Sequence, residues 1–231
     1  ITGGKRMAKV DLVIRNGQVF TNGVFIEGGI AVKDGVIVGI CKNELLPEAE
    51  KVLDVKGKAI FPGGIDPHVH FRDPGRSERE TFKTGTMAAA AGGVTTILEH
   101  PISKPPQYSP EILKNRINVA KPQSLVDFAF FGAAGAEFPE QISKLAKEGI
   151  VAFKTFLHQA PEGRDEEFVG LTMANDGEML DGFKEVAKTG LICAVHAENN
   201  DIITKMIKKL RSKSRVDYIA HAESRPPISE I

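Results

Sequence analysis

The sequence has few cysteines, no excess of charge of one sign and no long hydrophobic run. Cys41 and Cys193 are the only cysteines among 231 residues, which excludes a disulfide framework and favours a reducing cytoplasm. Thirty Lys and Arg balance thirty Asp and Glu, so no overall field draws the chain toward nucleic acid or an anionic membrane. The apolar runs fall far short of the roughly 20 residues that span a bilayer. We therefore expect small molecules or other proteins as partners.

Hydrophobic residues make up 42% of the chain and charged residues 26%, which is enough for a sizeable core. The first sixty residues show the pattern of short strands joined by tight turns. Asn16-Gly17, Asn22-Gly23 and Asp34-Gly35 tolerate the positive φ angles of two-residue hairpin turns. They predict a small antiparallel β unit. The strands that we expect around these turns are 10–14, 19–20, 29–33, 36–40 and 51–54.

From Ala59 onward, apolar strand-like runs alternate with helical patterns. Gly92-Gly93, Gly149 and Gly190 stand where a helix would end and the next strand begin, as helix-capping glycines do. Five β-then-α units in a row favour parallel strands with helical crossovers, either an open doubly wound sheet or a (β/α)8 barrel. The predicted strand–helix pairs are 59–71 with 78–91, 94–99 with 110–120, 126–132 with 139–148, 150–157 with 178–189, and 191–196 with 200–213.

Two histidines lie at the end of the first of these strands. Ligands bind at the C-terminal ends of strands in such folds, so polar side chains there require an explanation. Alternation along a strand puts His68 and His70 on one face, about 7 Å apart in rise. Two imidazoles on one face can share a divalent metal ion. Two separately hydrogen-bonded histidines are the simpler alternative.

A lysine and a third histidine lie at the ends of later strands. Lys154 interrupts an otherwise apolar strand, where burial lowers the pKa of an ammonium and leaves a nucleophilic amine. Such an amine can take up carbon dioxide and become a carbamate able to bridge two metals; a lysine that reaches the strand end with its ammonium is the alternative. His196 ends the fifth strand. Together these four side chains predict a metal site.

Several motifs resemble the amidohydrolase superfamily, and within it the cyclic amidases dihydroorotase, allantoinase, dihydropyrimidinase and hydantoinase. The resemblance runs from Val10 to the C-terminus. The motifs that carry it are Pro62-Gly-Gly-Ile-Asp66-Pro-His68-Val-His70-Phe, Gly85-Thr-Met-Ala-Ala-Ala-Ala-Gly92-Gly93-Val-Thr95-Thr96, Phe153-Lys154 and Val195-His196-Ala-Glu198-Asn199.

The resemblance implies an α/β fold: a TIM (β/α)8 barrel, of which this chain holds the first five units or so, with a small N-terminal β-sandwich domain. Residues 1–61 would form the N-terminal part of the sandwich and residues 62–231 the first part of the metal-dependent barrel. It also implies two divalent metal ions, usually zinc. His68 and His70 would bind one ion, His196 the other, and the carbon dioxide carbamate on Lys154 would bridge them.

Substrate-binding residues are suggested by the same resemblance. Arg72 resembles the dihydroorotase arginine that holds the substrate carboxylate, a task that suits a bidentate guanidinium. The asparagine that dihydroorotases carry after strand two is absent, since Glu99-His100 stands there. The tyrosine that dihydropyrimidinases place after the bridging lysine is also missing, so we expect His158 or His100 to donate to the substrate carbonyl in its place. Allantoinase-like and hydantoinase-like features occur side by side, and the substrate stays open among the cyclic amidases.

The reaction implied is hydrolysis of a ring amide by a hydroxide that bridges the two metals. Family members also use a fourth histidine and an aspartate as general base from later strands, which we expect beyond Ile231. We therefore expect this stretch alone to be inactive. We expect the intact protein to be a cytoplasmic homo-oligomer, dimer or tetramer, acting on a small cyclic amide or ureide without nucleic acid or membrane partners. The competing interpretations are a non-catalytic dihydropyrimidinase-like scaffold protein and an open α/β binding module without metal chemistry.

Overall fold

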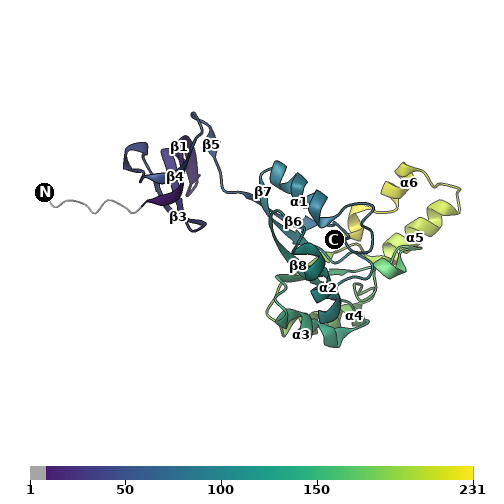
Figure 1. Ribbon diagram of the computed structural model, residues 1–231. Coiled ribbons are helices and arrows are strands. Elements are labelled where there is room, and N and C mark those ends of the chain that lie inside the picture. Colours follow the sequence, from purple (N-terminus) through teal and green to yellow (C-terminus); the bar gives the residue numbers. More distant parts are fainter. Residues whose placement is uncertain (1–8, 231) are drawn as a thin grey trace. The chain divides into compact units, whose positions relative to one another are not determined.

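The computed structural model describes residues 9–230 and divides the chain after Gly63 into two compact units (Figure 1). Residues 1–8 of the range that we assign to the sandwich, and Ile231, lie outside the described residues. No helix within residues 9–230 has the length and apolar character needed to cross a membrane.

The first unit is a five-stranded mixed sheet. Its strand order is β3-β2-β1-β4, and β5 pairs with β1 beside this path. The hairpin turns predicted at Asn22-Gly23 and Asp34-Gly35 are confirmed, because all four residues have φ between +48° and +80°. The elements are β1 (Val10–Thr21), β2 (Val24–Lys33), β3 (Val36–Cys41), the 3-10 turn η1 (Asn43–Leu45), β4 (Ala49–Asp54) and β5 (Ala59–Ile60).

Two details of the predicted first unit are wrong. Asn16-Gly17 is not a turn: β1 runs through it, and a bulge between Ile14 and Gly17 shifts its register against β2. Asn16 holds this left-handed bulge because its N–H donates to Asn43 Oδ1 at 2.9 Å and its side chain donates to Asp54 Oδ2 at 2.8 Å. The unit is also not purely antiparallel, since β4 and β5 both run parallel to β1. Both differences depend on contacts between distant parts of the chain.

The second unit is a parallel five-stranded sheet whose helices alternate with its strands. Its order, β10-β9-β8-β7-β6, follows the chain without reversal, and β6 and β10 lie at the two edges. An open doubly wound sheet reverses its order at a switch point, so this curled sheet is part of a barrel and the expected α/β barrel fold is confirmed. The elements are β6 (Gly64–Val69), α1 (Phe82–Ala91), β7 (Val94–Glu99), α2 (Pro110–Ala120), β8 (Asp127–Ala133), α3 (Pro139–Lys147), β9 (Ala152–Phe156), η2 (Asp165–Glu167), α4 (Asp176–Ala187), β10 (Cys193–His196), α5 (Asn200–Arg211), α6 (Tyr218–Glu223) and η3 (Pro227–Ser229).

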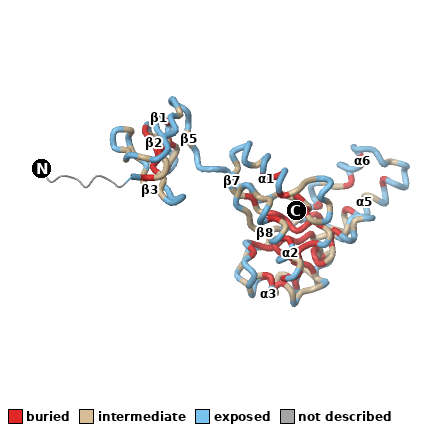
Figure 2. The backbone as a smooth tube through the Cα atoms, in the orientation of Figure 1, coloured by how far each residue is buried: buried red, intermediate tan, exposed pale blue. Residues whose placement is uncertain are grey.

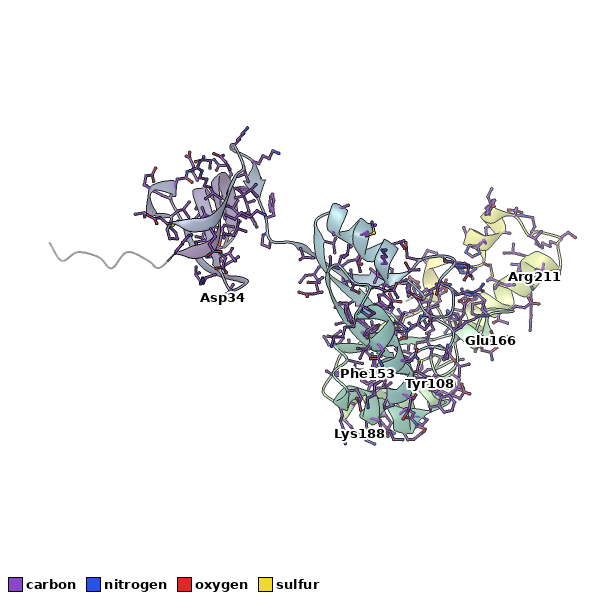
Figure 3. All side chains as sticks on the ribbon, in the orientation of Figure 1. Asp34, Tyr108, Phe153, Glu166, Lys188 and Arg211 are labelled. Carbon is purple, nitrogen blue, oxygen red and sulfur yellow. The ribbon has the colours of Figure 1, made fainter. Side chains whose placement is uncertain are left out.

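The predicted segment 59–71 proves to be two strands. Its first residues form β5 in the sheet of the first unit, and only β6 belongs to the barrel sheet. The capping glycines are confirmed, since Gly93, Gly149 and Gly190 all have positive φ directly after a helix. The main core of the second unit lies between the strands and their helices, and buried positions follow the strands (Figure 2). Phe153 of β9 lies in the middle of this core (Figure 3).

Candidate metal centre

His68 and His70 meet at the carboxyl end of β6. His68 belongs to the strand, His70 follows it directly, and their Nε2 atoms are 3.2 Å apart. Two nitrogen ligands of a tetrahedral zinc, each at about 2.0–2.1 Å, are roughly 3.3 Å apart, so the pair has the spacing of two ligands of one ion. Burial, together with the neighbouring His100 and His68, lowers the pKa of His70 to about 3. His70 is therefore neutral at physiological pH, which is the form that binds metal.

Lys154 lies inside β9, a strand whose five residues are all buried. Its side chain approaches the Phe156 ring, with Nζ 5.0 Å from the ring centroid. Within residues 9–230 no carboxylate forms an ion pair with this ammonium, and burial lowers its pKa. The pKa of His68 is lowered by burial and then by the charges of Lys154 and His196, so both of these groups lie within electrostatic reach of His68. Lys154 on β9 therefore acts on a histidine at the end of β6, three strands away in the sheet order.

His196 ends β10, where it pairs in register with Phe156 of β9. Its Nε2 lies 2.8 Å from Glu198 Oε2, and its ring centroid lies 5.2 Å from that of His158. The structure thus forms two groups of possible metal ligands, each with ligand atoms within 4.8 Å of one another. The groups are His68, His70 and His100, and His158, His196 and Glu198.

His100 supports the first group without being able to join it as a ligand of the same ion. Its ring lies between those of His68 and Phe131, at centroid distances of 3.9 and 4.0 Å. Because the His68 and His100 rings are stacked with only 14° between their planes, their in-plane lone pairs run in parallel planes and do not converge on one ion. Its Nε2 donates to Pro67 O at 3.0 Å, and burial lowers its pKa to about 4. With 2% of its surface exposed, its expected role toward substrate stays a prediction.

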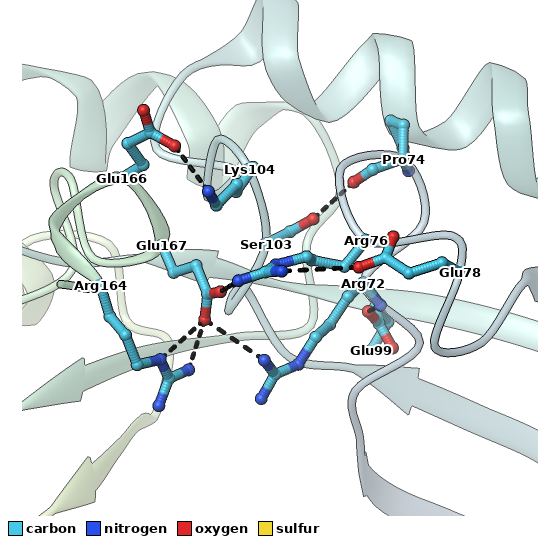
Figure 4. A network of polar contacts seen from close by, with 10 residues as sticks. All are labelled: Arg72, Pro74, Arg76, Glu78, Glu99, Ser103, Lys104, Arg164, Glu166 and Glu167. Carbon is cyan, nitrogen blue, oxygen red and sulfur yellow. Dashed lines mark hydrogen bonds and ion pairs between the residues drawn. The ribbon is translucent and has the colours of Figure 1, made fainter. Parts of the chain in front are cut away.

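The guanidinium of Arg72 is occupied by a carboxylate of the chain itself. Arg72, Arg76 and Arg164 all point toward Glu167 of η2 (Figure 4), with contacts of 3.2 Å from Arg72 and 3.1 Å from Arg76. Glu167 is 1% exposed, so this cluster ties the loop after β6 to the loop after β9. No sequence pattern pointed to Glu167 as a partner of Arg72, because the two residues are 95 positions apart. The binding of a substrate carboxylate by Arg72 stays a prediction, and such a carboxylate would compete with Glu167 for the Arg72 guanidinium.

Glu99 is the main buried residue whose role the sequence did not indicate. Its carboxylate accepts hydrogen bonds from the backbone N–H groups of Phe71 and Arg72 at 3.0–3.3 Å, directly after His70. Arg116 of α2 approaches it to 3.8 Å. Burial raises the pKa of Glu99 to about 7 against the opposing effects of Arg116 and these N–H groups. The sequence feature that could have pointed to Glu99 is its place as the last residue of the largely apolar strand β7.

A cavity of about 810 Å³ borders the second group of ligands. It is lined by His158 and His196, by apolar side chains that include Phe168 and Ile203, and by Arg225. Ring-sized molecules fit such a volume, which lies in the range of small-molecule sites.

The chain is similar to known proteins over nearly its whole length. The amidohydrolase family model matches residues 59–224. The chain is 36% identical over 226 residues to an allantoinase of Desulfitobacterium hafniense (strain Y51), covering 97% of this chain and 49% of that protein. It is 31% identical over 221 residues to an L-hydantoinase of Paenarthrobacter aurescens, covering 95% and 47%.

Solved structures give the same result. The L-hydantoinase (dihydropyrimidinase) of Arthrobacter aurescens has a TM-score of 0.86 at 30% identity, over 96% of this chain and 48% of that one. A D-hydantoinase has a TM-score of 0.80 at 30% identity, over 96% and 47%. The chain spans about half the length of the curated relatives it matches. Since the family model matches most of the chain, including every metal-ligand candidate, the chain belongs to the amidohydrolase family.

Proposed function

We propose that this protein is a metal-dependent hydrolase that opens a cyclic amide ring, as the names of its allantoinase and hydantoinase relatives suggest. The observation that carries the proposal is the pair of His68 and His70 Nε2 atoms 3.2 Å apart. The buried Lys154 lies within electrostatic reach of His68 and forms no ion pair with a carboxylate of residues 9–230. Buried cations without partners are costly, and they occur where chemistry requires them.

We assign one divalent ion to His68 and His70 and a second to His196, with Lys154 between them, and we choose zinc because imidazole suits it. Burial favours the neutral amine of Lys154. That amine adds to the carbon of carbon dioxide and loses a proton, which converts the side chain to a carbamate anion with two oxygen ligands. When bound, the two cations would supply a hydroxide near neutral pH and polarise the ring carbonyl.

His158 is the substrate-binding candidate that lines the cavity. Its Nδ1 lies 2.6 Å from Gln159 O, and a carbonyl accepts only, so Nδ1 carries the proton. Burial lowers its pKa, so Nε2 is a free acceptor. We propose that His158 accepts a hydrogen bond from the ring N–H of a cyclic amide or ureide, rather than donating to its carbonyl as the sequence suggested. Arg72 and His100 remain proposed substrate-binding residues that would orient the ring.

We further propose a division into a sandwich part, residues 1–61, and a barrel part, residues 62–231; the structure divides the chain two residues later. A homo-oligomeric enzyme in the cytoplasm fits the two free cysteines, Cys41 and Cys193. We propose that the 231-residue stretch alone does not turn over substrate, because its relatives are about twice as long.

Zinc binding by the purified chain tests the proposal. We expect zinc after growth in zinc-supplemented medium, and strong loss in His68→Ala and Lys154→Ala. Lys188→Ala is the matched control for Lys154→Ala, because Lys188 is an exposed lysine of the same unit that pairs with Glu185 and belongs to neither ligand group. Carbon-13 bicarbonate should give a carbamate resonance that Lys154→Ala lacks. A folded chain that binds no zinc would favour the scaffold interpretation.

The intact protein should then be assayed for ring opening of hydantoin, dihydrouracil, allantoin and dihydroorotate. We expect hydrolysis of at least one of the four, abolished by His68→Ala. If a zinc-loaded intact protein opens none of these rings, the proposed substrate class is wrong even though the metal site is right.

A further inference from the structure

A buried carboxylate, that of Glu198, hydrogen-bonds to one ring nitrogen of His196. Its Nε2 lies 2.8 Å from Oε2 of Glu198, whose side chain is 11% exposed. A carboxylate offers only acceptors, so Nε2 must carry the imidazole proton. In a neutral imidazole the lone pair then belongs to Nδ1, which is left as the only atom of His196 able to bind a cation.

The other oxygen of Glu198 is bound as well. Nε of Arg225 lies 3.1 Å from Oε1 of Glu198, and Nη1 of Arg225 donates to Ser224 Oγ at 2.8 Å. A second contact joins the same two segments: the Asn199 N–H donates to Ser229 O at 2.6 Å. The residues that follow α6 therefore contact two adjacent residues of the loop after β10, Glu198 and Asn199. Glu198 is the single side chain that lies between Arg225 and His196.

We propose that Glu198 and Arg225 form a positioning pair for His196. Arg225 fixes the orientation of the Glu198 carboxylate, and Glu198 fixes the imidazole in the Nε2–H form and in one ring orientation. Metal-binding histidines commonly donate their other N–H to such a carboxylate, and loss of the carboxylate typically weakens metal binding 10- to 100-fold. The metal part of this inference rests on the proposed function, whereas the tautomer part does not.

Glu198 itself is a poor candidate for a direct ligand. Its atoms lie within 4.8 Å of those of His158 and His196, which would suit a histidine–carboxylate site. However, Oε2 of Glu198 already accepts a hydrogen bond from His196, and Oε1 forms an ion pair with Arg225. A cation bound through Oε1 would compete with the half-buried guanidinium of Arg225, and one bound through Oε2 would compete with the imidazole of His196.

Nitrogen-15 NMR of the histidine side chains tests the tautomer directly on this chain, at about pH 8 where an ordinary imidazole is neutral. The His196 signals are assigned by their loss in His196→Asn. We expect the Nε2–H form in the unsubstituted chain, a mixture of tautomers in Glu198→Ala, and retention in Glu198→Gln, whose amide carbonyl still accepts. Arg225→Met should give an intermediate result. An Nδ1–H form in the unsubstituted chain, or no change in Glu198→Ala, would overturn the proposal.

Zinc titration of the same variants tests the consequence. We expect Glu198→Ala to weaken zinc binding 10- to 100-fold and Glu198→Gln to weaken it less. The zinc affinity of Arg225→Met should lie between that of Glu198→Gln and that of the unsubstituted chain. Arg211→Met is the matched control, since the Arg211–Glu162 pair, at 3.3 Å, borders the same cavity without touching His196. Equal effects of Arg225→Met and Arg211→Met contradict the proposal. If the unsubstituted chain binds no zinc, the proposed function fails while the NMR result still decides the tautomer.

Discussion

The two units of this chain differ in how far their paired charged side chains are exposed to solvent. In the first unit the ion pairs Asp11–Lys33 and Arg15–Asp54 lie on the surface, with side chains 35–51% exposed. In the second unit Glu99, Arg116 and Glu167 are each at most 1% exposed. Both units leave large apolar side chains in contact with water, for example Val36 at 62% in the first and Ile192 at 76% in the second, so the difference lies in the charges.

This difference indicates which unit carries the chemistry. Burying a charge costs free energy of solvation that an ion pair only partly offsets, so a fold has no need of buried charges for stability alone. The second unit buries them next to its strand ends, around the loop that follows His70 and the loop that follows β9. The first unit keeps its ion pairs Asp11–Lys33 and Arg15–Asp54 in solvent. Four predictions would break or sharpen this comparison.

The largest effect is expected from Arg116→Met. This change leaves the Glu99 carboxylate buried without its guanidinium and removes the bond from Arg116 to Gln107 Oε1, which measures 2.9 Å. We expect the free energy of unfolding of the second unit to fall by about 3–5 kcal/mol. Hydrogen exchange measured by mass spectrometry should show this loss in β6–β8 and none in β1–β3. The double change Glu99→Leu with Arg116→Met should recover part of it; an effect as small as that of Arg15→Met would refute the comparison.

Acidification should act next most strongly, and on the second unit. The pKa values of His70 and His100 fall to about 3 and about 4, so between pH 6.5 and 4.5 their protons favour the unfolded state. Glu99, whose pKa rises to about 7, binds one proton in the folded state over this range and so favours folding as the pH falls. For these three groups the net of about one proton should lower stability by roughly 1.4 kcal/mol for each pH unit below 6.5. His68 and His158, whose pKa values are also lowered, add to this loss in the same direction.

The first unit should not respond in that range, because the pKa values of its Asp11 and Asp54 are lowered by hydrogen bonds and change its stability only below their ordinary value of 3.8. Urea unfolding at a series of pH values, followed by hydrogen exchange of each unit, measures both. Glu99→Gln removes the opposing proton and should steepen the dependence. A second unit whose stability stays flat from pH 6.5 to 4.5 would show that these histidines are not shielded.

A smaller effect is expected from adding one methyl group. At Gly85 of α1 a new Cβ would lie 2.3 Å from Cε1 of Phe71, the residue after His70. Overpacking of this kind costs about 1–3 kcal/mol, reduced by up to about 1 kcal/mol because alanine favours a helix. At Gly39 of β3 nothing lies within 4 Å of the new Cβ. Thermal unfolding should therefore separate Gly85→Ala from Gly39→Ala, and equal midpoints would indicate that α1 can shift away from Phe71.

The smallest effect is expected from Lys33→Met in the first unit. The Asp11–Lys33 contact measures 2.8 Å, but both groups face water, which screens them. We expect a decrease in stability near the limit of measurement that shrinks further at high salt. A large decrease that persists at high salt would mean that the first unit also depends on its ion pairs.

The strand–helix order of the second unit could be predicted because local patterns determine it. β7 and α2 begin and end where expected, because the features that fix them act within a few residues. β7 is an apolar run after two glycines, and in the structure the Ser109 side chain caps α2 directly before Pro110. The Asn16-Gly17 bulge could not be predicted, because Asn16 is held by Asn43 and Asp54 from other elements. The split of 59–71 between two sheets likewise depends on partners far away in the sequence.

The candidate site divides in the same way. The histidines could be selected from strand ends, and Lys154 could be selected because it interrupts an otherwise apolar strand. The pairing of Arg72 with Glu167 could not, because Glu167 belongs to a short turn in a long loop. The contact between His196 and Glu198 was within reach of sequence reasoning, since the two residues are two positions apart and face the same side.

The two borders of the barrel sheet have a practical consequence. Within residues 9–230, β6 and β10 each have a neighbouring strand on one flank only, and Ile65, Ile192 and Val195 are exposed beside them. Edge strands of this kind expose unpaired N–H and C=O groups, which can pair with a strand of another molecule. We expect concentrated samples of this stretch to build up strand-swapped aggregates, so preparations for spectroscopy should be kept dilute or supplied with a peptide that extends the sheet.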